Sequence, residues 1–233
     1  MLKEKIFAAV LFLILTMSFL AGGCAELPHI ALISIDDHTE FNAICNRPFP
    51  SHPWRAVHAI HITGPLKQKD AVIGVTIVVP AERRIRTVIM TIEGLVLFDA
   101  NHFQGLTTRR RAIPPLDKPA FSDGLLHDVS LIFLPPEGTN RQVGRDSEGR
   151  LVCRWINQGE GTTDMVICNN GERQILQYNR KDRLRREIII SPHQKNSLPR
   201  EVTFQCHGLG GYTLEMTLLE LEPLTTYESL FEP

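Results

Sequence analysis

Short apolar runs alternate with turn-forming residues along most of this chain. Four such runs lie between residues 54 and 100 and six between residues 151 and 221, and they are rich in β-branched or aromatic side chains. The breaks between neighbouring runs are short, so we expect them to pair as antiparallel hairpins. The predicted strands are residues 54–63, 71–79, 85–92, 95–100, 151–156, 163–168, 173–178, 184–190, 200–207 and 212–221.

The stretch between the two groups of strands has a helical pattern. Its apolar residues recur at helical spacing until Pro135-Pro136 ends the pattern, and Ser122 or Asp123 could cap its start. The chain is therefore expected to be mainly β (α+β), with four strands, a helical insertion and six strands. The predicted helix, near residues 121–134, is carried by Phe121, Leu125, Val129, Ile132 and Phe133.

The first 23 residues have the pattern of a signal peptide. Lys3 and Lys5 precede an uncharged apolar run at residues 6–21, and two glycines follow before Cys24. The run of about 16 residues is shorter than the roughly 20 that span a bilayer comfortably. A cleaved signal at residues 1–23 is predicted in preference to a permanent transmembrane helix.

The sequence Leu20-Ala21-Gly22-Gly23-Cys24 resembles the lipobox of bacterial lipoproteins. The resemblance implies cleavage before Cys24, a diacylglycerol thioether on its sulfur and often a third chain, such as palmitate, on its new amino group. Two or three chains hold a protein firmly at a membrane, whereas one holds it only reversibly. Since Ala25 is not the Asp that retains such proteins at the inner membrane, we expect an anchor in the outer membrane, on its periplasmic face.

Three further regions follow from the pattern. Residues 24–53 lack a regular period and are predicted to be a lipidated tether and lead-in, with one short strand at residues 30–35 and a solvated Asp36-Asp37-His38 cluster. The β domain is expected to cover residues 54–222, and residues 223–233 form a tail.

Composition narrows the partners and the cysteine chemistry. The formal net charge is −1, with 43% hydrophobic and 22% charged residues, which is typical of one globular domain and gives no basic excess for nucleic acid. An exported protein meets an oxidising compartment, so Cys45, Cys153, Cys168 and Cys206 could form disulfides. If residues 160–161 make a two-residue turn, Cys153 faces Cys168 across a hairpin. A Cys153–Cys168 disulfide is one expectation, and buried free thiols are the other.

The sequence contains no grouping of residues typical of a metal site or an enzyme. His58 and His61 lie three apart on one predicted strand, so they point to opposite faces and cannot share a metal ion. No nucleophile elbow, Walker loop or dinucleotide fingerprint occurs. We therefore predict no metal, no cofactor and no enzymatic activity. Arg109-Arg110-Arg111 is expected in a loop, either solvated or touching lipid headgroups or phosphate, and residues 137–149 in a polar loop.

Three segments together resemble the LolA/LolB clan of lipoprotein carriers and receptors. Residues 88–98 form two apolar segments that meet at Gly94, and residues 149–155 and 198–221 continue the likeness. The resemblance implies a strongly curved antiparallel sheet, a half-open β-barrel, whose apolar concave face is covered by the helical insertion and offers a cavity for acyl chains. The same residues could instead pack as a closed core. The candidate cavity residues are Val88, Met90, Phe98, Leu125, Val129, Ile132, Phe133, Val202, Phe204, Leu214 and Met216.

Glu93 departs from the pattern of the receptor in this clan. There an exposed leucine precedes the hairpin glycine and delivers cargo into the membrane, whereas here Glu93 holds that place. An acidic residue at a loop tip opposes insertion beside anionic lipid. The binding fold is therefore expected without that delivery step.

Two hypotheses about function follow from these features. The first is a non-enzymatic, membrane-anchored periplasmic lipoprotein that binds an acyl chain or lipid-linked ligand and takes part in outer-membrane lipoprotein or lipid traffic. The alternative is a structural or assembly lipoprotein with a filled core, which docks an envelope protein partner on its outer face.

Overall fold

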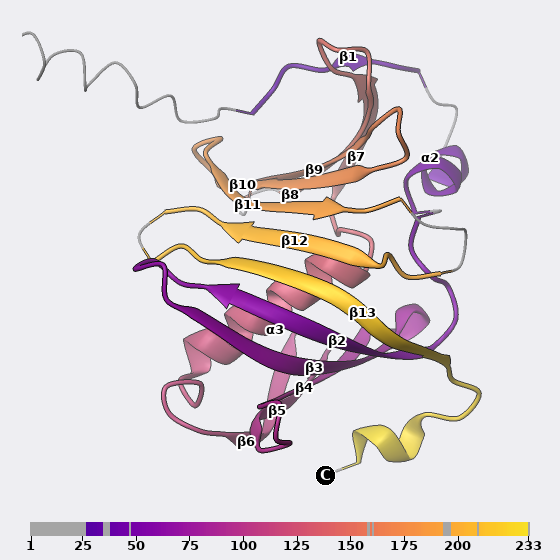
Figure 1. Ribbon diagram of the computed structural model, residues 1–233. Coiled ribbons are helices and arrows are strands. Elements are labelled where there is room, and N and C mark those ends of the chain that lie inside the picture. The colour runs from indigo at the N-terminus through magenta and orange to yellow at the C-terminus, as the bar shows by residue number, and fades with distance from the viewer. Residues whose placement is uncertain are drawn as a thin grey trace, which may run out of the picture.

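The protein forms one strongly curved antiparallel sheet with a helix along its inner side (Figure 1). The computed structural model describes residues 27–34, 38–46, 48–157, 159, 161–192, 197–208 and 210–232. In these residues the sheet has 13 strands in the order β1-β7-β8-β9-β10-β11-β12-β13-β2-β3-β4-β5-β6, so that β1 and β6 are its two edges. The predicted fold class is confirmed.

The strands lie where short apolar runs meet tight turns. All ten predicted strands are present, as β2 to β5 and β8 to β13. The bounds are β1 (Ala31–Leu32), β2 (Trp54–Thr63), β3 (Lys69–Val79), β4 (Arg84–Met90), β5 (Val96–Phe103), β6 (Leu106–Ala112), β7 (Asn140–Arg145), β8 (Leu151–Asn157), β9 (Gly161–Ile167), β10 (Arg173–Tyr178), β11 (Leu184–Ile190), β12 (Glu201–Cys206) and β13 (Thr213–Pro223).

Two strands, β6 and β7, fall where loops were predicted. Arg109-Arg110-Arg111 lies within β6, an edge strand whose residues are mostly exposed. A strand that is wet on both faces has no apolar alternation to reveal it. In β7 only Val143 and Gly144 are buried, so a single apolar side chain marks that strand in the sequence.

The helix predicted between the two groups of strands is α3 (Pro119–Phe133). It begins two residues earlier than expected, with Pro119 in its first turn and no side-chain cap at Lys118. Proline suits this position because the first helical N–H has no partner within the helix. Ser122 therefore does not cap the helix; its hydroxyl is buried and points back to the carbonyls of Leu116 and Lys118.

The described residues between Leu27 and Pro53 contribute a short strand and a helix to the packed fold. Ala31–Leu32 pairs with β7 as β1, within the predicted strand at 30–35. The helix α2 (His38–Cys45) places Phe41 and Cys45, both fully buried, against the end of the core. The sequence did not predict this helix because its few apolar residues stand among polar ones and form no regular period. Residues 1–26, with Cys24, and residues 35–37 lie outside the described part of the chain.

A disulfide joins Cys45 in α2 to Cys153 in β8, with an S–S distance of 2.01 Å and a sequence separation of 108 residues. The predicted Cys153–Cys168 pairing is wrong, and Cys168 is a free thiol. The reason is the register of the β8–β9 hairpin, in which Cys153 opposes Met165 and Asn157 opposes Gly161. The turn is therefore longer than the two residues assumed; Glu160, one of them, lies outside the described residues.

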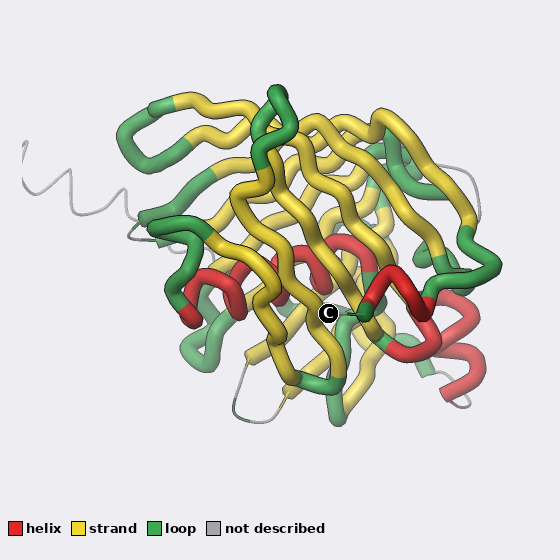
Figure 2. Tube along the Cα trace, turned by 90° about the horizontal axis from the view of Figure 1, so that it is seen from below, coloured by secondary structure: helices red, strands yellow, loops and turns green. Residues whose placement is uncertain are grey.

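The main core lies between α3 and the concave face of the sheet. Figure 2 shows α3 running across the strands on this side. Trp54 and Phe133 meet edge to face with ring centroids 5.1 Å apart, and Phe41 meets Trp155 in the same way at 5.3 Å. Full burial of each large apolar side chain contributes about 1.5 to 3 kcal/mol, so this layer is the main source of stability.

The C-terminal residues pack on the convex face of the sheet. Phe231, in the short helix η2 (Glu228–Phe231), is buried against Ile77 and Val79 of β3. The guanidinium of Arg84 lies 4.1 Å from the centroid of the Phe231 ring. The predicted tail is thus fixed to the outer surface of β3 to β5. In the described chain, no helix has the length and hydropathy needed to cross a membrane.

Candidate functional site

Most of the predicted cavity residues meet on the concave face, underneath α3. Seven of them are buried in the main core and two more, Leu125 and Leu214, are partly buried and pack against it. They come from β5, α3, β12 and β13, so the fold brings distant segments together as the pattern required. The buried seven are Phe98, Val129, Ile132, Phe133, Val202, Phe204 and Met216.

Val88 and Met90 lie on the other face of the sheet. In β4, Ile85 and Thr87 are buried and Ile89 pairs with Phe98 of the core, so the alternate residues Val88 and Met90 point outward. Residues 88–90 are all apolar, and apolar residues on both faces of a strand give no period from which to choose the inward set. The inward apolar residues of β4 that the prediction missed are Ile85 and Ile89.

A buried carboxylate holds the middle of α3 to the sheet. Asp128 accepts a hydrogen bond from Nε of Arg186 in β11 at 2.5 Å and another from the hydroxyl of Tyr212. The Asp128 side chain is 3% exposed and that of Arg186 is 24% exposed. Burial, and then the charge of Asp128, raise the pKa of Tyr212 well above its usual range, so the phenol stays a donor. We call Asp128, Arg186 and Tyr212 the polar latch.

The sequence contained one signal for the polar latch. Asp128 directly precedes Val129 of the apolar helical stripe, and a carboxylate near a buried stripe needs a partner. Arg186 lies in β11 and Tyr212 directly before β13, 58 and 84 residues away. Only the folded sheet identifies them.

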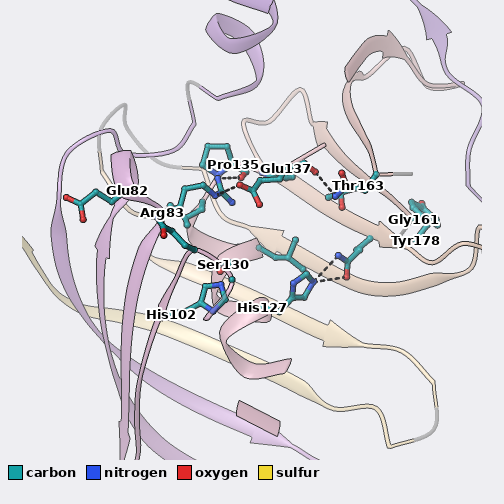
Figure 3. A pocket seen from close by; sticks show the side chains of 17 residues that line it. Glu82, Arg83, His102, His127, Ser130, Pro135, Glu137, Gly161, Thr163 and Tyr178 are labelled. Atoms are coloured by element: carbon teal, nitrogen blue, oxygen red, sulfur yellow. Dashed lines mark hydrogen bonds and ion pairs between the residues drawn. The ribbon is translucent and has the colours of Figure 1, made fainter. Parts of the chain in front are cut away.

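An open cleft of about 460 Å³ lies beside α3 (Figure 3), and its lining residue Gln177 accepts a hydrogen bond from Nη1 of Arg186 in the polar latch. Its wall contains His127 and Ser130 of α3 and Leu134 directly after the helix. None of the predicted cavity residues line it. The other lining residues are Glu82, Arg83, His102, Gln104, Gly105, Leu131, Pro135, Pro136, Glu137, Asn157, Gly161, Thr163, Gln177 and Tyr178.

Polar contacts across this cleft tie the end of α3 to both halves of the sheet. Nε of Arg83 pairs with Glu137 at 2.7 Å, and Nη1 of Arg83 donates to the carbonyl of Pro135 at 3.0 Å. On the opposite side, the ring Nε2 of His127 lies 3.0 Å from Nε2 and 3.4 Å from Oε1 of Gln177 in β10. Figure 3 shows both sets of contacts as dashed lines.

The cleft has the residues for hydrogen bonding but not an assembled catalytic group. Burial lowers the pKa of His102, which is consequently neutral near pH 7. Its ring Nδ1 contacts the hydroxyl of Thr107, which is not a cleft residue. Within the described residues, no three His, Cys, Asp or Glu side chains gather as a metal site. His58 is buried and His61 is exposed, so the prediction that they point to opposite faces is confirmed.

Glu93 lies at the exposed tip of the β4–β5 hairpin, beside Gly94 with φ of 89°. A hydrogen bond with the Thr91 side chain lowers the pKa of Glu93, which keeps its carboxylate ionised. Ile92 and Leu95 on either side are 69% and 53% exposed. The tip therefore carries apolar side chains around a charge that opposes deep insertion.

Comparisons with known proteins agree on the fold. No family model matches the sequence, and no curated protein matches it. A LolA superfamily protein from Nitrosomonas europaea is 8% identical with a TM-score of 0.51, and the match covers 86% of this chain and 99% of the other.

Two further solved structures are similar. An outer membrane lipoprotein-sorting protein domain from Vibrio parahaemolyticus is 9% identical with a TM-score of 0.50, covering 82% of this chain and 94% of the other. A DUF1329 family protein from Desulfovibrio piger is 11% identical with a TM-score of 0.50, covering 83% and 95%. The chain therefore has a LolA-like fold, as its hairpin and closing strands predicted.

Proposed function

We propose that this protein is a membrane-anchored, non-enzymatic envelope lipoprotein that binds an acyl chain or lipid-linked ligand on the concave face of its sheet. Binding requires α3 to move off that face. The fold shared with a lipoprotein-sorting domain supports this proposal, and so does the lipobox at Cys24. The single observation that carries it is that one helix covers the apolar face of an open sheet.

The two helices that meet the core are held in different ways. The disulfide from Cys45 to Cys153 locks α2 to β8. Contacts of α3 with the sheet are apolar packing, the polar latch and the contact of His127 with Gln177, and Arg83 holds Pro135 and Glu137 just after the helix. Because no covalent bond ties α3 to a strand in the described chain, it is the element that can be displaced.

Burial of an acyl chain on the concave face would contribute about as much free energy as burial of the α3 side chains that it replaces. Leu126, Val129, Leu131, Ile132 and Phe133 of α3 are buried, and burying five such side chains contributes roughly 8 to 15 kcal/mol. An acyl chain of about 16 carbons gains a similar amount, since each buried CH₂ contributes about 0.8 kcal/mol. A bound chain can therefore replace the helix without a large net cost.

Native mass spectrometry tests the proposal. The exported domain, starting after Cys24, is purified and incubated with a fluorescent fatty acid. We expect co-purified lipid or saturable uptake of the probe. If repeated preparations contain no lipid and take up no probe, the proposal fails.

A second function is favoured by the packing of the core. Nine of the eleven predicted cavity residues contact one another in a filled layer. A filled layer suits an assembly lipoprotein that docks an envelope protein partner. Absence of lipid together with a partner recovered by crosslinking in intact cells would select this alternative.

The anchor has its own test. We propose acylation of Cys24 and attachment to the periplasmic face of the outer membrane, for which the lipobox and Ala25 are the support. Intact mass of the membrane-extracted protein should show Cys24 with two or three acyl chains, and Cys24→Ser should abolish that mass. Separation of the two membranes tests the location.

A further inference from the structure

One end of the sheet is fixed close to the membrane anchor. Leu27 donates its N–H to the carbonyl of Asp182, in the β10–β11 turn, at 3.1 Å. Nη2 of Arg154 donates to the carbonyl of Pro28 at 2.7 Å, and Ile30 is buried against Val152 and Val166. The start of the described chain is therefore held firmly on the sheet beside the β10–β11 turn.

The distance from this point to the anchor is short. Only two residues, Ala25 and Glu26, separate Leu27 from Cys24, and three extended residue steps span at most about 11 Å. Acyl chains on Cys24 would therefore bring the β10–β11 turn to the surface of the bilayer. This step rests on the proposed acylation.

The same turn carries a concentration of positive charge, which we call the basic turn. It consists of four exposed cations, Arg180, Lys181, Arg183 and Arg185. None of them forms an ion pair with a residue that the structure describes. Asp182 is the one acidic residue between Asn179 and Arg186. Four neighbouring cations without an acidic partner repel one another, and an anionic surface would offset that repulsion.

The cations reach over the ends of neighbouring hairpins. The guanidinium of Arg185 lies next to Gly208 in the β12–β13 turn, since its Nη1 would be 2.9 Å from a Cβ added there. The guanidinium of Arg180 lies next to Gly159 in the β8–β9 turn, since its Nη2 would be 3.8 Å from a Cβ added there. The β2–β3 turn follows in the same row, on the left of Figure 1, with exposed Lys67 beside Leu66. Leu66 is 89% exposed. This row combines cations with an apolar tip, as the interface of a bilayer requires.

We infer that the basic turn docks the anchored protein on its own membrane by binding the headgroups of anionic phospholipid. Cations beside an anionic leaflet strengthen association by about five-fold each. Docking through this end would fix the orientation of the whole domain, since the chain from Leu27 to β1 does not swing freely on the sheet.

The test uses the full acylated chain in vesicles of phosphatidylcholine, with and without phosphatidylglycerol. Hydrogen exchange is followed by mass spectrometry over residues 176–187. We expect exchange in this segment to slow several-fold when phosphatidylglycerol is present, and the effect to fall at high salt. The variant Arg180→Glu/Lys181→Glu should lose the protection.

A matched control makes the same change of charge at the opposite ends of the strands. Arg145→Glu/Arg200→Glu alters two exposed arginines, at the end of β7 and just before β12, and should keep the protection. Equal exchange in both lipids, or equal loss in both variants, overturns the inference. Intact mass separates the two proposals: unmodified Cys24 overturns the anchor and the docking with it, whereas acylated Cys24 without lipid-dependent protection overturns the docking alone.

Discussion

The substitution Asp128→Asn isolates the role of the polar latch. It keeps the shape of the side chain but removes the charge that faces Arg186 and Tyr212. Breaking a buried ion pair costs about 3 to 5 kcal/mol. Arg186 is a quarter exposed and keeps its hydrogen bond from Nη1 to Oε1 of Gln177 at 3.0 Å. We therefore expect Asp128→Asn to lower the free energy of unfolding by only about 2 kcal/mol.

If α3 leaves the sheet when ligand binds, Asp128→Asn destabilises only the ligand-free state, in which α3 covers the sheet. The apparent affinity for a fluorescent fatty acid should then rise by up to about 30-fold, because 1.4 kcal/mol corresponds to a factor of ten. The assay is probe titration beside urea unfolding of the same protein.

The control for Asp128→Asn is Asp164→Asn. Asp164 is 1% exposed and binds Arg154 at 2.7 Å, on the face of the sheet away from α3. The substitution Asp164→Asn should lower the free energy of unfolding without changing the affinity for the fluorescent fatty acid. Asp128→Asn with unchanged affinity, or an equal rise in both variants, would refute the reasoning.

Three further predictions concern stability. The double change Cys45→Ala/Cys153→Ala should reduce the free energy of unfolding by about 3 to 5 kcal/mol, because the bond closes a long loop; peptide mapping without reductant should find Cys45 linked to Cys153 and Cys168 free to alkylate. Burial lowers the pKa of His58 to about 4, so the unfolded chain takes up a proton that the folded state excludes. Stability should be complete above pH 6.5 and fall by at most about 3 kcal/mol between pH 6.5 and 4, and His58→Leu should flatten that slope in urea titrations. Gly124→Ala should raise stability by about 0.5 to 1 kcal/mol in thermal unfolding, because an added Cβ meets nothing within 4 Å and the helix gains propensity; a lower midpoint would contradict this.

The central sheet was predictable because its strands are apolar on at least one face. Residues 200–207 and 212–221 alternate clearly, and in the structure Val202 pairs with Met216 on the buried side. The helical period of α3 identified Val129, Ile132 and Phe133 on its buried face, whereas Phe121 is exposed and the fully buried Leu126 was missed. These elements are determined locally, by period and by turn residues.

Other features depend on partners far away in the sequence. The edge strand β6 is polar on both faces, and the partner of Cys153 is fixed by the packing of α2 against β8. Neither leaves a local period. The inward set of β4 was also ambiguous, because residues 88–90 are all apolar. The polar cleft and the polar latch are built from segments that only the curvature of the sheet brings together.

The claim that an acyl chain replaces α3 on the concave face can be tested most directly by fixing the helix in place. His127 and Gln177 contact each other across the edge of α3 and lie outside the apolar layer. In a background with Cys168→Ser and Cys206→Ser, His127→Cys and Gln177→Cys are joined by a short, cleavable thiol crosslinker. Uptake of the fluorescent fatty acid should be lost in the crosslinked domain and return when the linker is cleaved. Equal uptake before and after cleavage would show that ligand binds without moving α3, and would contradict the account.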